Sequence, residues 1–296
     1  MQSFSQKTKE MLCRAETGRS CCAAAELAGL VLYTMKSRGG VRLVTENGAV
    51  AERIVRLAER CFGARLTAVW KKSCFVCSVS DGRLLKKILG EMCDFDECGC
   101  TVKNVIVKKS CCRGAFLRGA FLGGGTIVDP NKNYNLEFIT SNESLCSATE
   151  RLLSECGFEF RRTERRGSCV LYSKNSETIC DLLTLMGAFG SNMEILNVKI
   201  ERELRNNLNR AANGETANFD KVIKAAVRQI KAIEKIERTA GLDSLPQELR
   251  ETAQLRMRFK DLSLDELGKK VTPCLTKSGI NHRLKKIIDI ADAIDD

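Results

Sequence analysis

The chain of 296 residues is long enough for two domains, and its 44% content of hydrophobic residues excludes a disordered chain. Its 48 Lys and Arg residues exceed its 37 Asp and Glu residues, and the net charge of +11 favours a partner with a phosphate backbone. No apolar run reaches the roughly 18 residues of a membrane span, and the polar start (MQSFSQKTKE) lacks a signal-peptide core. We therefore expect a cytoplasmic protein with no membrane partner.

The 16 cysteines are expected to be reduced thiols, because the cytoplasm opposes structural disulfides. A metal site is the alternative interpretation, because a CxxC pattern is followed by a group of further cysteines. These cysteines are Cys74, Cys77, Cys93, Cys98, Cys100, Cys111 and Cys112. Most of them stand among apolar residues, where Ala or Val would also fit, and no second CxxC completes a ligand set. We expect no metal and no other cofactor.

An internal repeat organises the N-terminal part of the chain. Residues 21–32 (CCAAAELAGLVL) resemble residues 111–122 (CCRGAFLRGAFL). In each copy an amphipathic helix follows, at 51–62 and 148–156, and in the first copy two short strands are predicted next, at 65–70 and 74–80. A repeat of this size is too long for a solenoid unit and indicates two halves related by a pseudo-twofold axis.

The opening helix of each copy has small residues where two backbones could approach closely. They are Ala28 and Gly29 in the first copy and Gly119 and Ala120 in the second. A helix-interior glycine costs about 1 kcal/mol relative to Ala, so we infer close contact between the two helices. The segments LAGLVLYTM (27–35) and LRGAFLGGG (117–125) resemble the paired LAGLIDADG helices of homing endonucleases.

In homing endonucleases an acidic residue near each helix end holds the divalent metals that cut DNA. The matching positions here are Thr34 and Gly124, and neither supplies the carboxylate that such metals need. Asp129 lies beyond the second helix and has no acidic counterpart after the first. The resemblance therefore implies an endonuclease-like scaffold that is not an enzyme, with no catalytic residues and no small-molecule substrate.

The first copy looks truncated after its opening helix. Only residues 41–45 are predicted as a strand there, whereas the second copy has candidates at 126–128 and 134–140. We expect the two sheets to be uneven.

A long helical pattern starts near residue 197 and continues to Arg238, with a break predicted at Asn213 and Gly214. Basic residues at spacings of three and four line one face of it. They are Lys221, Lys224, Arg228, Lys231 and Lys235. Two interpretations stay open for this stripe: a solvated helix face and a surface that contacts phosphates.

Three helices are predicted after Gly241. Capping-box patterns at Ser244 and Ser263 indicate a helix through about residue 258 and a short helix over 264–271. Thr276 is placed to cap a last helix that continues to about residue 291. A short helix, a tight turn and a longer helix are typical of a helix-turn-helix that docks in the DNA major groove.

The last helix has an apolar face and a polar, basic face. Residues 269–288 include six basic residues and no acidic one. His282 is interpreted as a base or phosphate contact, since no residue beside it in sequence would make it catalytic. We expect the following residues to contact DNA: Lys269, Lys270, Thr276, Lys277, Ser278, Asn281, His282, Arg283, Lys285 and Lys286.

Together with the two degenerate LAGLIDADG helices, three segments resemble the WhiA family: RNNLNRAANGETAN (205–218), LSLDELG (262–268) and KSGINHRL (277–284). The resemblance implies an α+β fold, in which a pseudo-twofold LAGLIDADG-like domain precedes an all-α helix-turn-helix domain similar to region four of sigma factors. The expected parts are a first domain at 1–195 (repeats at about 20–100 and 110–190), a helical linker at 196–240 and a helix-turn-helix domain at 241–296.

Members of that family regulate transcription in sporulating filamentous bacteria and support cell division and chromosome segregation in others. We expect the division and segregation role here, for a nucleoid-associated bacterial protein whose partner is double-stranded DNA. The alternative is a sequence-specific transcription factor for sporulation or division genes, with other regulators or RNA polymerase as further partners. An adaptor that binds proteins through its repeat domain, and an active metal-dependent endonuclease, are the competing classes.

Overall fold

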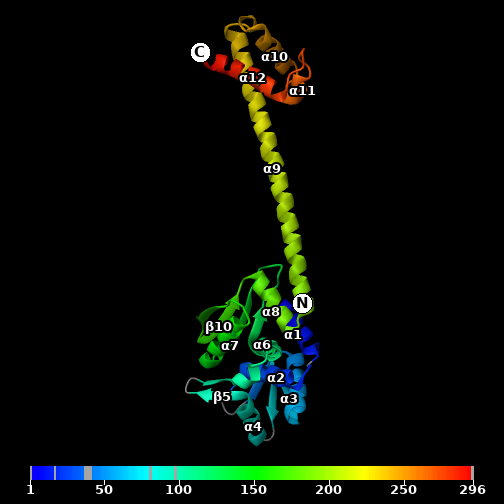
Figure 1. The fold of residues 1–296 in the computed structure, drawn as a ribbon, viewed down its shortest axis with the longest axis vertical. Helices are drawn as coiled ribbons and strands as arrows, with labels where there is room; N and C mark the ends of the chain where they lie inside the picture. The colour runs from blue at the N-terminus through cyan, green and yellow to red at the C-terminus, as the bar shows by residue number, and fades with distance from the viewer. Residues whose placement is uncertain (1, 17, 37–41, 80–81, 97–98, 295–296) are drawn as a thin grey trace. The chain divides into compact units, whose positions relative to one another are not determined.

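The computed structural model describes residues 2–16, 18–36, 42–79, 82–96 and 99–294. The chain forms two compact units, Met1–Arg202 (unit 1) and Glu203–Asp296 (unit 2), as Figure 1 shows. The expected end of the first domain at residue 195 lies inside a single helix, α9 (Phe189–Thr239), which belongs to both units.

Unit 1 contains two copies of one order of elements. The first copy consists of α2 (Ser20–Thr34), β1 (Met35–Lys36), β2 (Arg42–Thr45), α3 (Gly48–Phe62), β3 (Leu66–Lys71), β4 (Cys74–Val79) and α4 (Gly82–Met92). The second consists of α6 (Ser110–Gly124), β7 (Gly125–Ile127), β8 (Leu136–Thr140), α7 (Glu143–Glu155), β9 (Arg161–Arg165), β10 (Ser168–Ser173) and α8 (Ser176–Met186). Helix α1 (Phe4–Arg14) precedes them, and β5 (Cys93–Asp96), β6 (Gly99–Val102) and α5 (Asn104–Val107) connect them.

The two sheets have the same strand order, β1-β2-β4-β3 and β7-β8-β10-β9, and all their pairs are antiparallel. The expectation of a truncated first sheet is therefore wrong. The strand that the sequence did not predict is β1, whose two residues Met35 and Lys36 pair with Leu43 and Arg42. A strand of two residues is too short to produce an alternating pattern, and only its pairing partner defines it.

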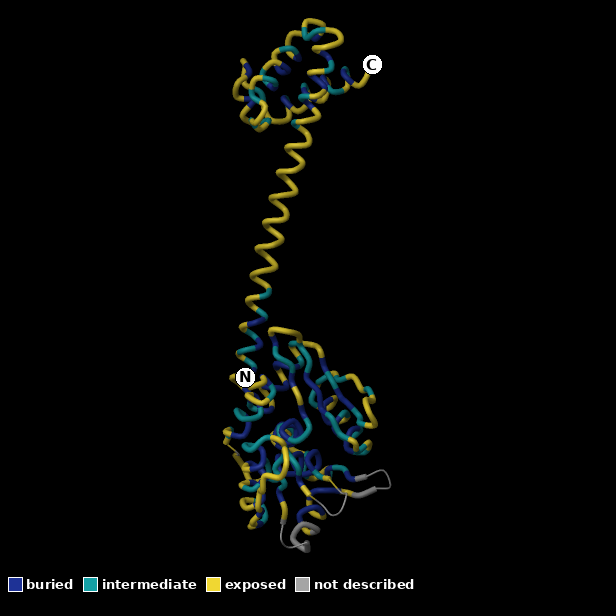
Figure 2. Tube along the Cα trace, turned by 180° about the vertical axis from the view of Figure 1, so that it is seen from behind, coloured by how far each residue is buried: buried dark blue, intermediate teal, exposed yellow. Residues whose placement is uncertain are grey.

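The core of unit 1 is built around α2 and α6, which lie side by side (Figure 1). A Cβ added to Gly29 would collide with the backbone of Phe116, and one added to Gly119 would collide with the backbone of Glu26. The predicted close approach of the two helices is thus confirmed, and it explains both glycines. Helix α3 and strand β2 contact α2, and helix α8 and strand β8 contact α6, while α7 packs on β8 and β10. Most residues of α2 and α6 are buried, and the buried parts of the chain are dark blue in Figure 2.

Helix α9 continues through Asn213 and Gly214, so the predicted break is wrong. One helix-interior glycine costs about 1 kcal/mol, which the neighbouring turns of a 51-residue helix can absorb. Residues 203–225 are exposed on every side (Figure 2). None of the helices in the described ranges is both long and apolar enough to span a membrane.

One expectation about the cysteines is also corrected. Cys146 of α7 and Cys169 of β10 form a disulfide, so these two are not free thiols. They come together because α7 packs on β10, a contact between segments that sequence spacing alone does not reveal.

Unit 2 packs the end of α9 against α10 (Gln247–Arg258), α11 (Leu264–Gly268) and α12 (Lys277–Asp292), with a 3-10 turn at Leu242–Ser244. Two predicted details are wrong. Ser244 does not cap α10, because its hydroxyl donates to the Gly241 carbonyl inside the 3-10 turn, and α10 begins after Pro246. Helix α11 ends at Gly268, before the predicted end at residue 271.

Candidate nucleic-acid interface

Helix α12 is held on unit 2 by its apolar face. Ile280, Leu284, Ile287 and Ala291 are buried, and they belong to one hydrophobic cluster with residues of α9, α10 and α11. The spacing of these residues is that of one helix face, as the sequence predicts. Because the whole length of this face is packed, the opposite face of α12 is directed outward.

The outward face consists of Ser278, Asn281, His282, Lys285 and Lys286, which we call the α12 face. All five residues are exposed, and Lys277 is exposed at the start of the helix. Hydroxyl, amide and imidazole groups can donate to or accept from base edges, and lysines neutralise phosphates. The structure thus brings together most of the residues predicted to contact DNA.

The turn before α12 fixes where its first residues point. The Thr276 hydroxyl accepts a hydrogen bond from the Gly279 amide at 3.2 Å, which confirms it as the N-cap. A Cβ on Gly268 would collide with the Leu275 carbonyl oxygen, so a residue without a side chain lets this turn pass close to the end of α11. Thr276 therefore positions the helix, and its hydroxyl is already engaged.

Arg283 is directed differently from its neighbours. Its guanidinium lies 3.1 Å from the Glu248 carboxylate on α10, it donates to the Glu248 carbonyl at 3.4 Å, and its side chain is only 18% exposed. The sequence places Arg283 beside the polar face, but the carboxylate that turns it toward α10 is distant in sequence. This contact ties α12 to α10.

Lys269 and Lys270 lie after α11 and are both exposed. Lys269 is 2.7 Å from the Asp265 carboxylate, and this hydrogen bond, together with the negative charge, raises the pKa of Lys269. The Lys270 ammonium lies 4.6 Å from the centre of the Phe259 ring, which orients it by a cation–π contact. Both side chains are accessible to a phosphate.

Sequence reasoning missed Arg256, which is buried on α10 and supports the approach to α11. It donates to the Leu262 carbonyl at 2.6 Å, and burial lowers its pKa. Arg256 is at the helical spacing of the buried residues Leu249, Thr252 and Ala253, and a basic residue at such a position is the signal that could have identified it.

The two positions that match the metal-binding acids of homing endonucleases, Thr34 and Gly124, are tightly surrounded by neighbouring residues in unit 1. Thr34 is 1% exposed and its hydroxyl donates to the Leu30 carbonyl at 2.6 Å. A Cβ on Gly124 would collide with the Tyr33 ring and lie 2.6 Å from the Ile139 carbonyl oxygen, so a larger residue does not fit there. Asp129 accepts hydrogen bonds from the Asn131 amide at 2.8 Å and side chain at 3.1 Å, which occupies it in its own turn.

A buried ion cluster, also missed from sequence, lies beside the crossing of α2 and α6. Glu26 is fully buried; its carboxylate accepts two hydrogen bonds from Arg53, at 2.7 and 3.0 Å, and lies 3.3 Å from Arg118 Nε. Arg53 also donates to the carbonyls of Cys13 and Ala15. Glu26 is the one charged residue within α2, which was the available signal.

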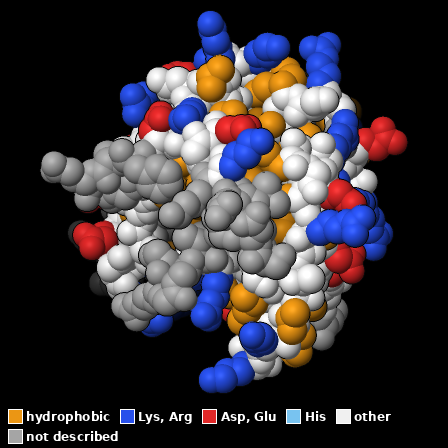
Figure 3. Space-filling model, turned by 90° about the horizontal axis from the view of Figure 1, so that it is seen from below, with side chains coloured by type: hydrophobic (Ala, Val, Ile, Leu, Met, Phe, Trp, Pro, Cys, Tyr) orange, Lys and Arg blue, Asp and Glu red, His pale blue; other side chains and the backbone are white. Residues whose placement is uncertain are grey.

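On the face in Figure 3, Lys and Arg side chains are mixed with acidic and apolar ones, with no single basic patch among the coloured atoms. In unit 2, Arg228 of the basic stripe pairs with Asp292 at 3.1 Å and Lys235 donates to the Ile294 carbonyl at 2.8 Å. Those two residues contact the C-terminal end of α12 and the residues after it. Lys221, Lys224 and Lys231 are exposed, as is Arg228.

The CxxC pattern does not form a metal site in the part of the chain that the structure describes. Cys77 is buried in β4 and Cys74 is half-buried, and neither belongs to a group of closely spaced metal ligands. Cys98 lies outside the described residues.

The whole chain is similar to proteins of known family. It superposes on the full-length DUF199/WhiA crystal structure from Thermatoga maritima with a TM-score of 0.62 and 28% identity, covering 100% of both chains. A protein of Ruminiclostridium cellulolyticum named "Probable cell division protein WhiA" is 39% identical over 99% of this chain and 98% of its own length. The chain belongs to the WhiA family. A WhiA relative of the same name from Alkaliphilus oremlandii is 38% identical over 98% of this chain and 97% of its own length.

The parts of this WhiA protein match the family separately. The profile of the WhiA LAGLIDADG-like domain matches residues 113–205, and that of the WhiA C-terminal HTH domain matches residues 208–291. The N-terminal LAGLIDADG domain of a DUF199/WhiA protein has the same fold, with a TM-score of 0.52 and 19% identity. The expected fold class, a LAGLIDADG-like domain followed by a helix-turn-helix domain, is confirmed.

Proposed function

We propose that this WhiA protein binds double-stranded DNA with the α12 face and acts in cell division and chromosome segregation. The observation that carries the proposal is the face itself: hydrogen-bonding and basic side chains are exposed along one helix whose opposite side is fully packed. The cellular role is supported by the name of the relatives, which cover nearly the whole chain.

The residues have different roles in this proposal. Ser278, Asn281 and His282 face the bases, while the lysines neutralise phosphates. Those lysines are Lys269, Lys270, Lys277, Lys285 and Lys286. Thr276 and Arg283 position α12 through the cap and through α10.

Salt dependence tests the phosphate contacts. Each phosphate that a lysine neutralises adds about 0.9 to the slope of log K against log salt, because condensed counterions are released. Lys285→Ala and Lys286→Ala should each lower the slope for a duplex of random sequence by about 1. Lys87→Ala, at an exposed lysine of α4, is the matched control and should leave the slope unchanged. Equal slopes in all variants would exclude α12 as the DNA-binding element.

Base reading is tested separately by selecting bound duplexes from a random pool. Asn281→Ala should lose the preference at one base position, at a cost of about 1–3 kcal/mol for the preferred site. Binding to random duplex should change little, because an amide neutralises no phosphate. An unchanged sequence preference would contradict a base contact at Asn281.

We propose that unit 1 is not a nuclease. Two-metal hydrolysis needs carboxylates around the phosphate, and the matching positions Thr34 and Gly124 have none. Supercoiled DNA incubated with excess protein and Mg²⁺ or Mn²⁺ should stay uncut. Metal-dependent nicking that co-purifies with the protein would overturn this part.

A sequence-specific transcription factor is the second candidate, favoured by the exposure of Asn281 and His282 beside the lysines. A genome-wide occupancy map, compared with transcript levels after Asn281→Ala, distinguishes the two roles. Binding at promoters with altered transcripts favours transcriptional control, whereas scattered sites with unchanged transcripts favour the chromosome role.

The adaptor role, with RNA polymerase or another regulator as partner, rests on unit 1. Val69 and Trp70 of β3 are 47% and 54% exposed, which leaves apolar surface on that sheet. Trp70→Ala should reduce co-purification of a protein partner and leave DNA binding unchanged. Identical partners for both forms would remove support for this surface.

A further inference from the structure

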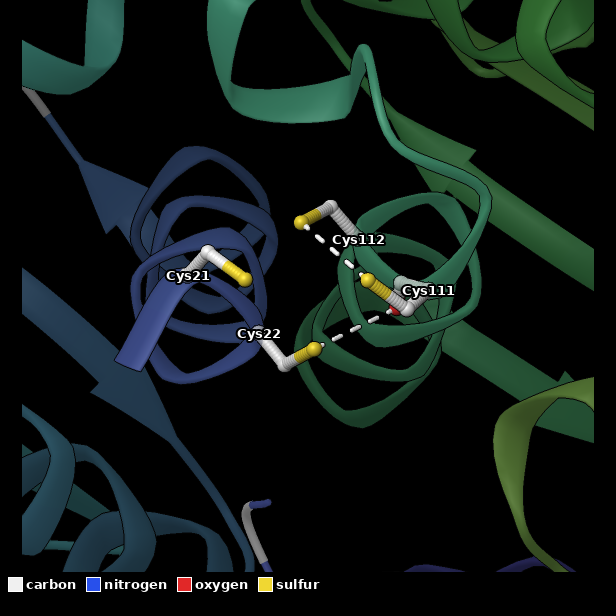
Figure 4. A group of neighbouring side chains, drawn as sticks. All are labelled: Cys21, Cys22, Cys111 and Cys112. Atoms are coloured by element: carbon white, nitrogen blue, oxygen red, sulfur yellow. Dashed lines mark hydrogen bonds between the residues drawn. The ribbon is translucent and has the colours of Figure 1, made fainter. Parts of the chain in front are cut away.

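Four cysteines from the two copies of the repeat meet at one end of the α2 and α6 pair. Cys21 and Cys22 lie in the first turn of α2, and Cys111 and Cys112 lie in the first turn of α6. Figure 4 shows the two pairs facing each other across the helix ends. All four sulfur atoms lie within 4.8 Å of one another, and the Cys111 and Cys112 sulfurs are 3.9 Å apart.

This spacing matches the size of a tetrahedral thiolate site. With zinc–sulfur bonds of about 2.3 Å, the sulfurs of a site with four cysteine ligands are about 3.8 Å apart. The four thiols therefore need shifts of about 1 Å or less, which side-chain rotation supplies. The bond from the Cys22 thiol to the Cys111 carbonyl, at 3.6 Å, is weak for a hydrogen bond and would be given up.

The electrostatic surroundings suit the charge of such a site. Four thiolates and one Zn²⁺ carry a net charge of 2−, and the N-terminal end of each helix is the positive end of its dipole. Neither helix has a side chain bonded at its N-cap or an acidic residue in its first turn, and the N-cap residues are Arg19 and Lys109. No carboxylate of these two first turns therefore repels the anionic site.

Access and burial are also suitable. Cys112 is buried, Cys21 and Cys22 are half-buried and Cys111 is exposed, so an ion can enter and then be largely enclosed. Sulfur ligands favour Zn²⁺ over the hard cations Mg²⁺ and Ca²⁺, which take oxygen ligands.

We propose that Cys21, Cys22, Cys111 and Cys112 bind one Zn²⁺ that clamps the two halves of unit 1 together. Binding forms four zinc–sulfur bonds and releases the four thiol protons to solvent. The ion joins the N-terminal ends of α2 and α6, whereas Thr34 and Gly124 lie at their C-terminal ends. It is a structural site, separate from the positions where an endonuclease of this scaffold holds its metals.

Metal content of the full-length protein is the direct test. Protein purified under reducing conditions from zinc-containing medium should hold one zinc per chain. Anaerobic replacement by Co²⁺ should produce the visible absorption of a tetrahedral tetrathiolate. Chelation should lower the melting temperature, and added zinc should restore it. Wild-type protein without zinc and without that Co²⁺ spectrum would overturn the proposal, even if no variant folds.

Variants locate the ion. Cys21→Ser with Cys111→Ser should lose the bound zinc and the cobalt–thiolate absorption, whereas Cys61→Ser, at a half-buried cysteine outside the group, should keep both. Zinc retained in the double variant would place the ion elsewhere and refute the site. A disulfide between the two pairs in freshly purified reduced protein, detected by mass spectrometry in place of zinc, would also refute it.

Discussion

The buried carboxylate of Glu26 decides how firmly α2 is joined to its neighbours. Glu26→Gln keeps the size of the side chain but removes the negative charge between two guanidinium groups. The side chains of Arg53 and Arg118 are only 4% and 12% exposed, so water cannot compensate their charge. Removing one partner of a buried ion pair costs about 3–5 kcal/mol. Arg53 keeps two carbonyl acceptors, so we expect the lower end, about 3 kcal/mol.

The assay uses the single tryptophan, Trp70, which lies in unit 1 and reports on that unit alone. Urea unfolding followed by its fluorescence gives the free energy of unfolding of unit 1. Glu143→Gln is the matched control, because Glu143 pairs with Arg162 at 2.8 Å but is 74% exposed, and such pairs contribute about 0–1 kcal/mol. A loss below about 1 kcal/mol for Glu26→Gln, or equal losses in both variants, would refute the reasoning.

Three further predictions concern other parts of the chain. Gly124→Asp should destabilise unit 1 by about 1–3 kcal/mol in the same unfolding assay, because the added Cβ would lie 2.6 Å from the Ile139 carbonyl oxygen of β8. The same variant should not cleave supercoiled DNA in the presence of Mg²⁺. Arg283→Ala should weaken binding to all duplexes by a similar factor, because Arg283 positions α12. In thermal unfolding, a double-mutant cycle of Arg283→Ala with Glu248→Ala should give a coupling energy of about 0.5–1 kcal/mol. A changed base preference in Arg283→Ala would contradict the positioning role. Ser263→Ala should cost about 1 kcal/mol through the lost N-cap. Hydrogen bonds from the Ser263 side chain and backbone lower the pKa of Glu266, so the stabilisation from this contact is present above the ordinary pKa of a glutamate and is lost as the pH falls through the lowered pKa. The variant should therefore show a smaller acid-induced loss of melting temperature than the wild type.

The helix-turn-helix could be predicted in detail because its signals are local. A capping box at Ser263 and a cap at Thr276 both act within three residues, and the structure confirms them. The spacing of three and four between the buried apolar residues of α12 likewise depends only on helix geometry. Ser244 shows the limit of such patterns, because a serine hydroxyl can bond to a nearby carbonyl in a turn as readily as it caps a helix.

Contacts between distant segments could not be predicted in this way. The two residues of β1 count as a strand only because β2 lies beside them, and Arg283 turns toward α10 because Glu248 is there. The CxxC pattern is formed by Cys74 and Cys77, whereas the cysteines that meet in the structure are two adjacent pairs, one from each copy of the repeat.

By itself, the sequence determined that two glycine-bearing helices pack closely, that the acids of an endonuclease are absent at positions 34 and 124, and that a capped, basic helix ends the chain. These properties depend on residue identity and on spacing along one helix. Only the tertiary structure decided that Glu26 is enclosed by two arginines, that residue 124 has no room for a side chain, and that four thiols form one group. Each of these depends on which surfaces the α2 and α6 crossing brings together, and that crossing joins residues far apart in the chain.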